Sequence, residues 1–314
     1  MNTDNLNFDK LVTVHAPGTV ANLVCGFDIL GLCLAAPYDV MQVRLLDEKK
    51  VVIISGDGFS LPTDPTANTA GAPLIEMLKG IDANIGFEVT IHKKIKPGSG
   101  IGSSAASAGG AVVAANLLLG NIFSKEQLVH FAMYGEKIAS GAMHADNIAP
   151  CIYGGITLIR SHEPLDIIPL PLPQLFVTIL HPQIEVKTAD ARQILRKEIS
   201  LKQGIEQWGN VAALVAGLFK NDYELIGRSL RDVVAEPARK MLIPAFDLVK
   251  ENCLKAGAIG GGISGSGPSI FMLSQNEATA KKVETAMIEV YKKIGLQYHT
   301  HVTSISQKGV EIVD

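Results

Sequence analysis

Ile95-Lys96-Pro97-Gly98-Ser99-Gly100-Ile101-Gly102-Ser103-Ser104-Ala105-Ala106-Ser107 is the stretch that decides the interpretation of this chain. Its three glycines have no β-carbon, so the backbone of this segment can approach an anion closely. The small residues that follow predict a buried helix, and the N–H groups at a helix start attract phosphate. The serine hydroxyls add ligands for phosphate oxygens or a metal ion. The stretch predicts a phosphate-binding loop, with a glycine turn into a tightly packed helix as the alternative.

Two better-known glycine motifs do not fit this loop. A P-loop requires Gly-Lys-Ser/Thr, but Gly102 is followed by Ser103, so the essential lysine is missing. A dinucleotide fingerprint requires a third glycine where Ser103 stands, and an acidic residue about 20 positions further on. The chain instead has Asn121-Ile122-Phe123 there. The loop is therefore neither of these two nucleotide sites.

Length and composition indicate a chain with a large core. Its 314 residues exceed the roughly 150 of a typical domain, which favours two domains. Hydrophobic residues make up 47% of the sequence and charged residues 19%, and the net charge is -3. This balance gives no reason to expect nucleic acid or an anionic membrane surface as a partner.

Cysteine usage and the N-terminus favour a cytoplasmic protein. The four cysteines are scattered without a Cys-x-x-Cys pair, which fits reduced thiols better than disulfides or a zinc site. Residues 1–5 lack the basic and apolar blocks of a signal peptide. The longest apolar stretch, 105–119, is broken by Ser107 and Asn116 and is shorter than the ~18 residues of a membrane span.

Polar residues in apolar surroundings supply further candidates in the first half. Asn22 and Asp28 stand among small and apolar residues, where they either form turns or bind a ligand. Glu136 lies near the end of a helix predicted to begin after Ser124. If Glu136 lies beside a serine hydroxyl, the two side chains would suit a Mg²⁺ site; otherwise Glu136 is an ordinary surface carboxylate. The segment His144-Ala145-Asp146-Asn147 is either a ligand-binding constellation or a helix cap.

The second half contains two arginines and another glycine loop. Prolines within 163–175 predict a change of domain, and Thr188 is a plausible cap for a helix that carries Arg192. Arg192 and Arg239 together provide two rigid forks suited to a carboxylate. Residues 260–268 form a second glycine loop, but it leads into a strand, so its match to a dinucleotide motif is spurious.

The periodicity predicts an order of strands and helices. Strands are expected at 11–14, 39–46, 51–55, 86–92, 151–160, 175–181, 269–273 and 298–305, with a break at 16–19. Helices are expected at 68–78, 105–119, from 124, 205–219, 223–233, 242–256 and 277–294.

Three blocks, Ala16–Gly31, Gly98–Ser107 and Gly260–Pro268, resemble in order and spacing the small-molecule kinases of the GHMP superfamily. Within that superfamily the chain resembles the homoserine kinase family, because it also has the run from His144 to Pro150, Thr188 with Arg192, and Glu236-Pro237-Ala238-Arg239. The resemblance covers residues 12 to about 275, and its motifs are specific only jointly.

The resemblance implies an α+β, two-domain GHMP kinase fold. Residues 1–165 would form an N-terminal α/β domain with a left-handed β-α-β crossover, and residues 166–314 a ferredoxin-like C-terminal domain. ATP would bind in the cleft between them, at Asn68, Pro97, Gly98, Ser99, Gly100, Ile101, Gly102, Ser103, Ser104, Ala105, Ala106 and Ser107. Mg²⁺ would lie at Ser104 and Glu136, which with Asn147 would form the catalytic group.

The same resemblance implies L-homoserine as substrate and a homodimer as assembly. Homoserine would be held by Asn22, Asp28, His144, Asp146, Thr188, Arg192, Arg239 and Gly265. The two aspartates would take its ammonium group and the two arginines its carboxylate. Other GHMP kinases carry a catalytic aspartate where this chain has Asn147. Homoserine kinases generally have an asparagine there, as this chain does. The product would be O-phospho-L-homoserine, the precursor of threonine.

Two rival functions remain open at this stage. A mevalonate-type GHMP kinase would keep the glycine loops but would not need arginines at both 192 and 239. A non-catalytic ligand sensor of this fold would bind ATP or homoserine without turnover, although Ser104 and Glu136 argue against it.

Overall fold

Alternating apolar residues build the larger of the two sheets in this computed structural model. The structure describes residues 6–186 and 188–313, without the side chains of residues 188 and 189. Its central strands are β1 (Leu11–Ala21), β2 (Leu30–Leu46), β3 (Val51–Gly58) and β4 (Gly86–Lys93). The path through the sheet is β11-β1-β2-β4-β3, and β2 also pairs with β5 (Ile156–His162), which pairs with β6 (Leu165–Leu170). Every second residue faces the core in β4 and in β2 from Asp39 onward.

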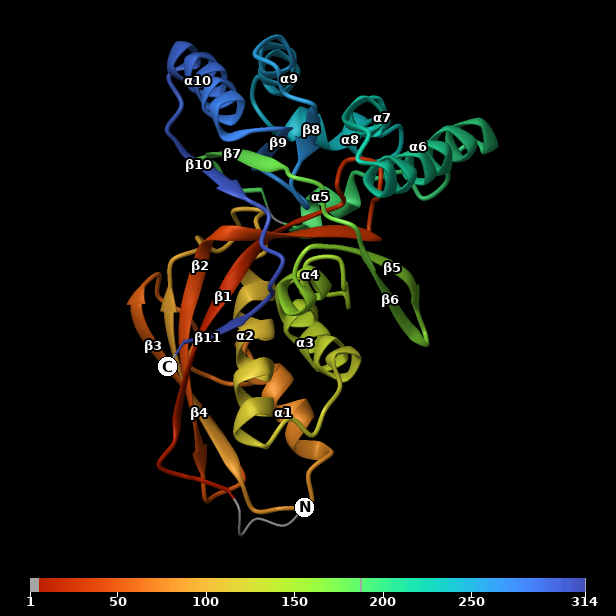
Figure 1. Cartoon of the computed structure of the whole chain (residues 1–314). Coiled ribbons are helices and arrows are strands. Elements are labelled where there is room, and N and C mark those ends of the chain that lie inside the picture. Colours follow the sequence, from red (N-terminus) through yellow and green to blue (C-terminus); the bar gives the residue numbers. More distant parts are fainter. Residues whose placement is uncertain (1–5, 187, 314) are drawn as a thin grey trace.

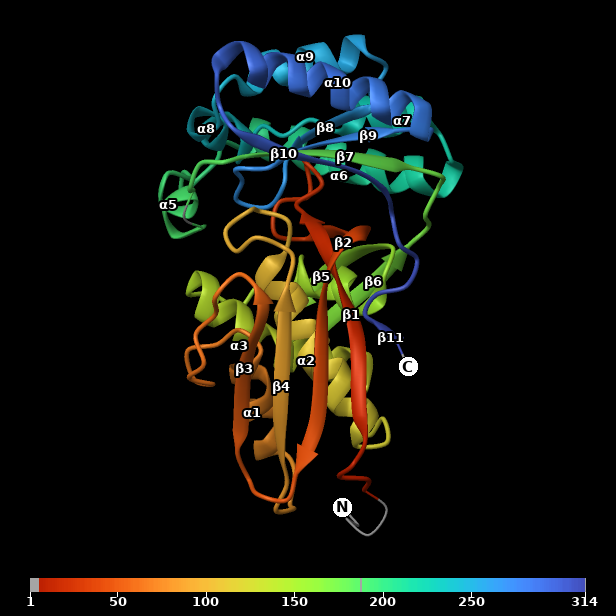
Figure 2. The same cartoon turned by 90° about the vertical axis from the view of Figure 1, so that its left-hand side faces the viewer.

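The connection from β3 to β4 is a parallel crossover through α1 (Gly71–Lys79). In Figure 2 both strands run upward, β4 lies to the right of β3, and α1 lies behind the sheet. This arrangement is left-handed, as the resemblance implied, whereas most such crossovers are right-handed. Strands β2 and β3, although consecutive in the sequence, are separated by β4 and do not pair with each other.

Together with α1, three further helices cover one face of this sheet (Figure 1). They are α2 (Ser103–Leu118), α3 (Lys125–Ser140) and α4 (Ile148–Tyr153). Helix α2 is apolar all round and lies at the centre of the core, as its small residues predicted. Helix α3 begins after Ser124, as predicted, and starts with a capping box, in which Ser124 and Gln127 each bond to the other's backbone N–H.

The smaller sheet forms the second domain, in the order β10-β7-β9-β8. Its strands are β7 (Phe176–Pro182), β8 (Gly260–Ile263), β9 (Ile270–Ser274) and β10 (Tyr298–Ser304). All its pairings are antiparallel, and α9 (Phe246–Lys255) and α10 (Glu277–Ile294) cover its outer face. This order and connectivity are those of a ferredoxin-like domain.

A helical insertion separates β7 from α9. It contains α5 (Thr188–Gln193), α6 (Leu201–Lys220), α7 (Tyr223–Ser229), α8 (Glu236–Arg239) and the 3₁₀ turn Lys240–Leu242. Helix α7 ends four residues before its expected end. Helix α9 begins after Pro244 rather than at 242, because proline lacks the N–H that a helix interior needs.

Several local expectations were wrong. The break at 16–19 is a bulge within β1, where the register with β2 shifts between Pro17 and Thr19. Residues 151–153, expected as strand, belong to α4, and residues 260–263, expected as loop, form β8. The last strand, β11 (Glu311–Val313), pairs with β1 and returns the chain to the first sheet.

The proline-rich segment does not separate the sheets where it was expected to. Strand β6 lies within it and pairs with β5, so the boundary between residues 165 and 166 falls inside β6, a strand of the larger sheet. The chain passes to the smaller sheet only between Leu170 and Phe176. Across 6–186 and 188–313, the helices are too short or too polar to cross a membrane.

Candidate active site

The glycine loop between β4 and α2 lies where the two domains meet, beneath the smaller sheet in Figure 2. Gly98, Gly100 and Gly102 all have left-handed backbones, with φ of 73°, 81° and 69°. A β-carbon on Gly100 would lie 2.6 Å from the carbonyl oxygen of Gly267, and one on Gly102 would lie 1.9 Å from Oγ1 of Thr19. Glycine is therefore required at 100 and 102 for both conformation and space.

The second glycine loop supports the first. The Ser264 hydroxyl donates to the carbonyl oxygen of Gly100 at 2.6 Å, and the Ser269 hydroxyl donates to that of Ser99 at the same distance. With their carbonyls bound from the far side, the peptide units of the loop are fixed in one orientation. The second glycine loop thus has a bracing role that its sequence did not reveal.

A buried ion pair that sequence reasoning missed lies under the same loop. Lys93 forms an ion pair with Asp39, and the Lys93 ammonium also donates to the carbonyl oxygen of Ser103 at 2.6 Å and to Oγ of Ser107 at 2.9 Å. The other Asp39 oxygen accepts from the backbone N–H groups of Lys94 and Ile95 at 2.8 and 2.9 Å. Burial lowers the pKa of Lys93, and the nearby Asp39 opposes that shift.

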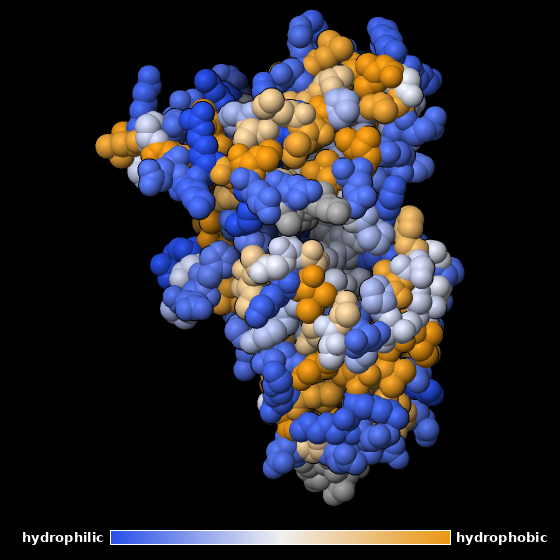
Figure 3. Space-filling model, turned by 180° about the vertical axis from the view of Figure 1, so that it is seen from behind, coloured by the Kyte–Doolittle hydropathy of each residue, from blue (hydrophilic) through white to orange (hydrophobic). Residues whose placement is uncertain are grey.

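A cleft of about 530 Å³ opens beside the loop. Many of the residues expected to bind ATP and Mg²⁺ line it: Asn68, Pro97, Gly98, Gly100, Gly102, Ser103, Ser104, Ser107 and Glu136. Lys93 and residues 185 and 186 also line it, and Ser266 of the second glycine loop completes it on the side of the smaller domain. The surface is visibly hollowed between the two domains in Figure 3.

Other expected nucleotide residues do not line the cleft. Ala105 and Ala106 are fully buried in the first turn of α2, and Ser99 and Ile101 face a different pocket. The Asn68 amide is already engaged, since it donates to the carbonyl oxygen of Pro62 at 2.6 Å and accepts from the N–H of Ala70 at 2.8 Å. Asn68 therefore shapes the cleft wall rather than offering a free amide.

Of the hydroxyls of Ser103, Ser104 and Ser107, only that of Ser104 donates to a carboxylate. Ser104 Oγ donates to Glu136 Oε2 at 2.8 Å, whereas the Ser103 hydroxyl donates to the carbonyl oxygen of Ile95 at 2.9 Å. Glu136 is 9% exposed, and burial raises its pKa. Among the described residues no group of three metal-binding side chains exists. A single carboxylate with a hydroxyl is the donor set that Mg²⁺ uses when phosphates and water supply its other ligands, so the residues fit this ion.

The residues expected to hold an amino acid come together on the other side of the second glycine loop. Arg192 on α5 forms an ion pair with Asp28, in which Nη2 of the arginine donates to both carboxylate oxygens, at 2.6 and 2.9 Å. The Arg192 and Asp28 side chains are 39% and 29% exposed, so solvent reaches the pair. Thr188 begins α5, and its side chain lies outside the described part of the chain.

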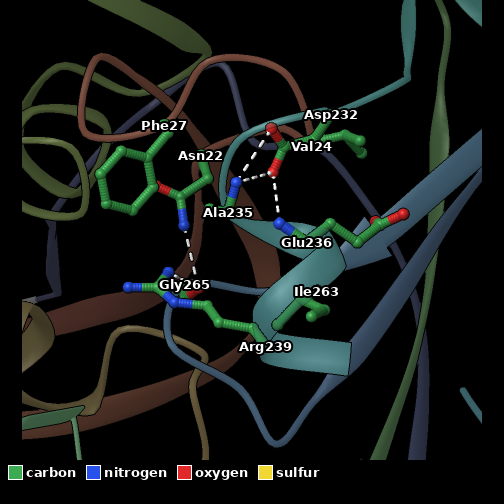
Figure 4. Close-up of a pocket in the computed structure, with 9 residues that line it drawn as sticks. All are labelled: Asn22, Val24, Phe27, Asp232, Ala235, Glu236, Arg239, Ile263 and Gly265. Carbon is green, nitrogen blue, oxygen red and sulfur yellow. Dashed lines mark hydrogen bonds between the residues drawn. The ribbon is translucent and has the colours of Figure 1, made fainter. Parts of the chain in front are cut away.

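Arg239 and Asn22 meet at the carbonyl oxygen of Gly265, as Figure 4 shows. Arg239 donates to it at 3.0 Å and Asn22 at 2.9 Å, and Arg239 also donates to the carbonyl oxygen of Ala191 at 3.0 Å. The Phe27 ring lies under both guanidiniums, 5.0 Å from Arg239 and 5.7 Å from Arg192. Arg239 is therefore held by backbone on two sides and stacked on an aromatic ring.

The segment before α4 brings three polar side chains close to these groups. Asn147 Oδ1 accepts from the Thr19 hydroxyl at 2.8 Å, which fixes the orientation of its amide. Burial, with the charges of Asp28 and Glu136, raises the pKa of Asp146 to about 7. Burial lowers the pKa of His144, whose Nε2 has no partner among the described residues.

Backbone strain marks the same place. Asn22, Leu23, Val24 and Asp28 have φ of 73°, 40°, 64° and 61°, a region that residues other than glycine rarely adopt. Such strain persists only where the surroundings enforce it and gathers at binding sites. The sequence carried no signal for it at Leu23 and Val24, whereas Asn22 and Asp28 are residue types that tolerate a left-handed backbone.

Comparison with known proteins agrees with this geometry. The family model described as "GHMP kinases N terminal domain" matches residues 70–155, and the one described as "GHMP kinases C terminal" matches residues 214–293. The fold is that of GHMP kinases. The mevalonate kinase of L. major, solved in complex with R-mevalonate, shares this fold, with a TM-score of 0.70 at 15% identity over 96% of this chain and 99% of its own.

More similar relatives narrow the class. A homoserine kinase of Chloroherpeton thalassium is 48% identical over 97% of this chain and 100% of its own, and one of Chlorobium phaeobacteroides is 46% identical over the same shares. The crystal structure of homoserine kinase from Cytophaga hutchinsonii superposes with a TM-score of 0.91 at 47% identity, covering 98% of this chain and 100% of its own. The chain belongs to the homoserine kinase family.

Proposed function

We propose that this chain transfers a phosphoryl group from ATP to the primary alcohol of L-homoserine, giving O-phospho-L-homoserine. The observation that carries the proposal is the Asp28–Arg192 pair, in which opposite charges meet next to Arg239, since both arginines lie over the Phe27 ring. An amino acid presents an ammonium and a carboxylate in the same way. It can replace this half-exposed pair by binding each partner separately, at little cost, because exposed ion pairs contribute little stability.

The residues have separable tasks in this proposal. Backbone N–H groups of the glycine loop and the start of α2 receive the phosphates, and the braces from Ser264 and Ser269 keep those groups in place. Asp28 and Asp146 bind the ammonium of homoserine, and Arg192 and Arg239 bind its carboxylate. Ser104 and Glu136 would hold Mg²⁺, which neutralises phosphate charge when it is bound.

Alignment supplies most of the rate enhancement in such a transfer. The transition state is loose, so a strong base is not obligatory, and positioning can contribute roughly 7 to 11 kcal/mol. Asn147, held by Thr19, would orient the substrate alcohol or a water molecule beside it. The alcohol proton would leave through that water or through the phosphate.

The test is ADP release with three alcohols: L-homoserine, mevalonate and galactose. Turnover with homoserine at least about 100-fold above the other two is expected, because only an amino acid satisfies both charges of the Asp28–Arg192 pair. Preference for mevalonate would overturn the proposal in favour of the mevalonate-type alternative. ATP binding without turnover of any of the three would favour the sensor alternative.

We also propose that the chain forms a homodimer through the outer face of α6. Leu201, Ile205, Trp208 and Phe219 are between 56% and 71% exposed, and their spacing of three, four or multiples of seven residues places them on one stripe of the helix. In Figure 3 the upper part of the surface, which belongs to the C-terminal domain, carries several orange, hydrophobic areas. Gly209 lies on the same helix, and a β-carbon there would meet nothing within 4 Å.

Gly209 allows this interface to be tested. A glycine inside a helix costs about 0.5 to 1 kcal/mol relative to alanine, and the monomer has no contact that requires it. Gly209→Ala should therefore raise the melting temperature of the monomer and weaken the dimer in sedimentation equilibrium, and Trp208→Glu should dissociate it. A monomeric wild type, or a dimer unaffected by both changes, would contradict this interface.

We further infer a cytoplasmic location, since all four cysteines are free thiols.

A further inference from the structure

The phosphate loop has a second side, which faces a separate pocket of about 360 Å³. This back pocket is lined by Pro37, Phe59, Lys94, Ile95, Lys96, Ser99, Ile101, His181, Gln183, His299, Thr300 and His301. Among the described residues, none lines both the back pocket and the cleft. In Figure 2 the loop between β4 and α2 rises towards β7 and β10, the strands that carry the three histidines.

The back pocket is strongly basic. Two lysines and three histidines line it, and no acidic side chain is among its described lining residues. The Lys96 ammonium donates to Oε1 of Gln183 at 2.8 Å, and the Lys94 ammonium lies 5.7 Å from the centre of the Tyr38 ring. Among the described residues neither lysine forms an ion pair, so no carboxylate neutralises their charges there. Two lysine cations, together with three histidine rings that can donate N–H groups, favour an anion in this pocket.

The smaller sheet positions the histidines. His299 and His301 alternate with Thr300 on β10, and Thr300 donates its hydroxyl to Glu284 of α10 at 2.6 Å. Successive side chains of a strand point to opposite faces, so both histidines face away from α10 and towards the phosphate loop. On β7, His181 stands directly opposite His299. Like groups in a cross-strand pair repel each other once protonated.

Ser99 provides an independent observation. It is 1% exposed and lines the back pocket, and its hydroxyl has no hydrogen-bond partner among the described residues. A buried hydroxyl without a partner is destabilising, so it marks a position where a ligand atom completes the bonding. The carbonyl group of the same residue is bound by Ser269, which holds the side chain in place.

From these contacts we propose that the back pocket binds a small phosphate-bearing anion, with the Ser99 hydroxyl, Lys94, Lys96 and the three histidines as its ligands. A metal ion is the less suitable occupant, because the described histidines form no metal-holding group and lysine ammonium groups repel cations. Burial, followed by the charges of Lys96, His299 and His301, lowers the pKa of His181 to about 4. A bound anion would offset that repulsion.

Occupancy of this pocket would act on the phosphate loop from behind. Ser99 and Lys96 belong to the loop, whereas His181 and His299 belong to the smaller domain, so one anion would connect the two. This link would hold the loop against the strands that already brace it. The binding step itself does not depend on the proposed homoserine kinase activity.

The experiment is a titration of the ligand-free full chain with inorganic phosphate at constant ionic strength, followed by the ring signals of all eight histidines in NMR. Saturable shifts at His181, His299 and His301, with a higher pKa for His181, are expected, while His130 on α3 stays unchanged. Equal shifts in sodium chloride alone, or none at all, would overturn the proposal. Repeating the titration with glycerol phosphate separates a free phosphate site from one that accepts phosphate monoesters.

Two variants assign the shifts to this pocket. His301→Gln should weaken phosphate binding about tenfold, the size expected for one hydrogen bond to a charged group. Ser99→Ala should also weaken binding, yet raise the melting temperature in phosphate-free buffer, because it removes an unpaired buried hydroxyl. Ser104→Ala, in the cleft, should leave the histidine shifts intact. Loss of the shifts in Ser104→Ala but not in the other two would place the phosphate in the cleft and refute the proposal.

Discussion

Replacing Asp146 with asparagine tests the electrostatics of the site most directly. The side chain is 5% exposed, and burial, followed by the charges of Asp28 and Glu136, raises its pKa from 3.8 to about 7. Asparagine has nearly the same shape and cannot ionise. The change therefore removes the charge while it keeps the volume.

The magnitude follows from linkage. Between pH 3.8 and about 7 the folded protein retains a proton that the unfolded chain has already released. The free energy of unfolding therefore falls as pH rises through this window and is constant in this respect above it. A difference of about three pH units corresponds to about 4 kcal/mol, since each unit is worth about 1.4 kcal/mol. Asp146→Asn should be more stable than the wild type by up to that amount at pH 8 and nearly equal at pH 4.

The assay is urea unfolding of both proteins at a series of pH values, together with initial rates. The variant should become increasingly more stable than the wild type as pH rises, while its KM for homoserine increases about tenfold or more, because the ammonium loses a charged partner. Asp247→Asn is a matched control, because the Asp247 side chain is 73% exposed and should not change the pH dependence. Parallel stability curves for Asp146→Asn and wild type would refute the reasoning.

Three further substitutions test other parts of the site. Arg239→Leu removes the donors to Ala191 and Gly265 and should raise the KM for homoserine far more than that for ATP; equal effects would remove Arg239 from the substrate pocket. Ser104→Ala should weaken the Mg²⁺ dependence of the rate severalfold, and an unchanged magnesium titration would count against the placement of the ion. Gly100→Ala forces a β-carbon to 2.6 Å from the Gly267 carbonyl oxygen and should abolish ATP binding. Gly98 also has a left-handed backbone but has open space around it, so Gly98→Ala should lower the free energy of unfolding by only about 1 to 2 kcal/mol. Similar losses in the two glycine variants would show that the clash at Gly100 is not decisive.

Local signals predicted the glycine loop well, because its function depends on backbone freedom that only glycine provides. The capping box at Ser124 and the buried helix after Ser103 were predictable for the same reason: each is determined by residues within one or two turns. The pairing of the two domains through Ser264 and Ser269 was not predictable, since more than 160 residues separate each hydroxyl from its acceptor.

The buried pair under the loop had a signal that could have been used. Lys93 continues the inward-facing series Phe87, Val89 and Ile91 of β4, and Asp39 begins the inward series of β2. A period of two therefore assigns both charges to the core, where each needs a partner. Strand β8 had no such signal, because its three glycines have low strand propensity and pair with β9 only through tertiary context.

The unfavourable features of this protein gather around its proposed ligands. The ionised Asp146, the unpartnered His144 Nε2 and the left-handed backbones of Asn22 and Asp28 all cost stability in the free protein. The costs at Asp146 and His144 fall when a ligand supplies the missing charge or hydrogen bond, so ligand binding is favoured by their relief. A site assembled for stability alone would have placed apolar or mutually bonded residues at these positions. The concentration of such costs between the glycine loop and Arg239 is therefore a physical reason, independent of family likeness, to locate the amino-acid site there.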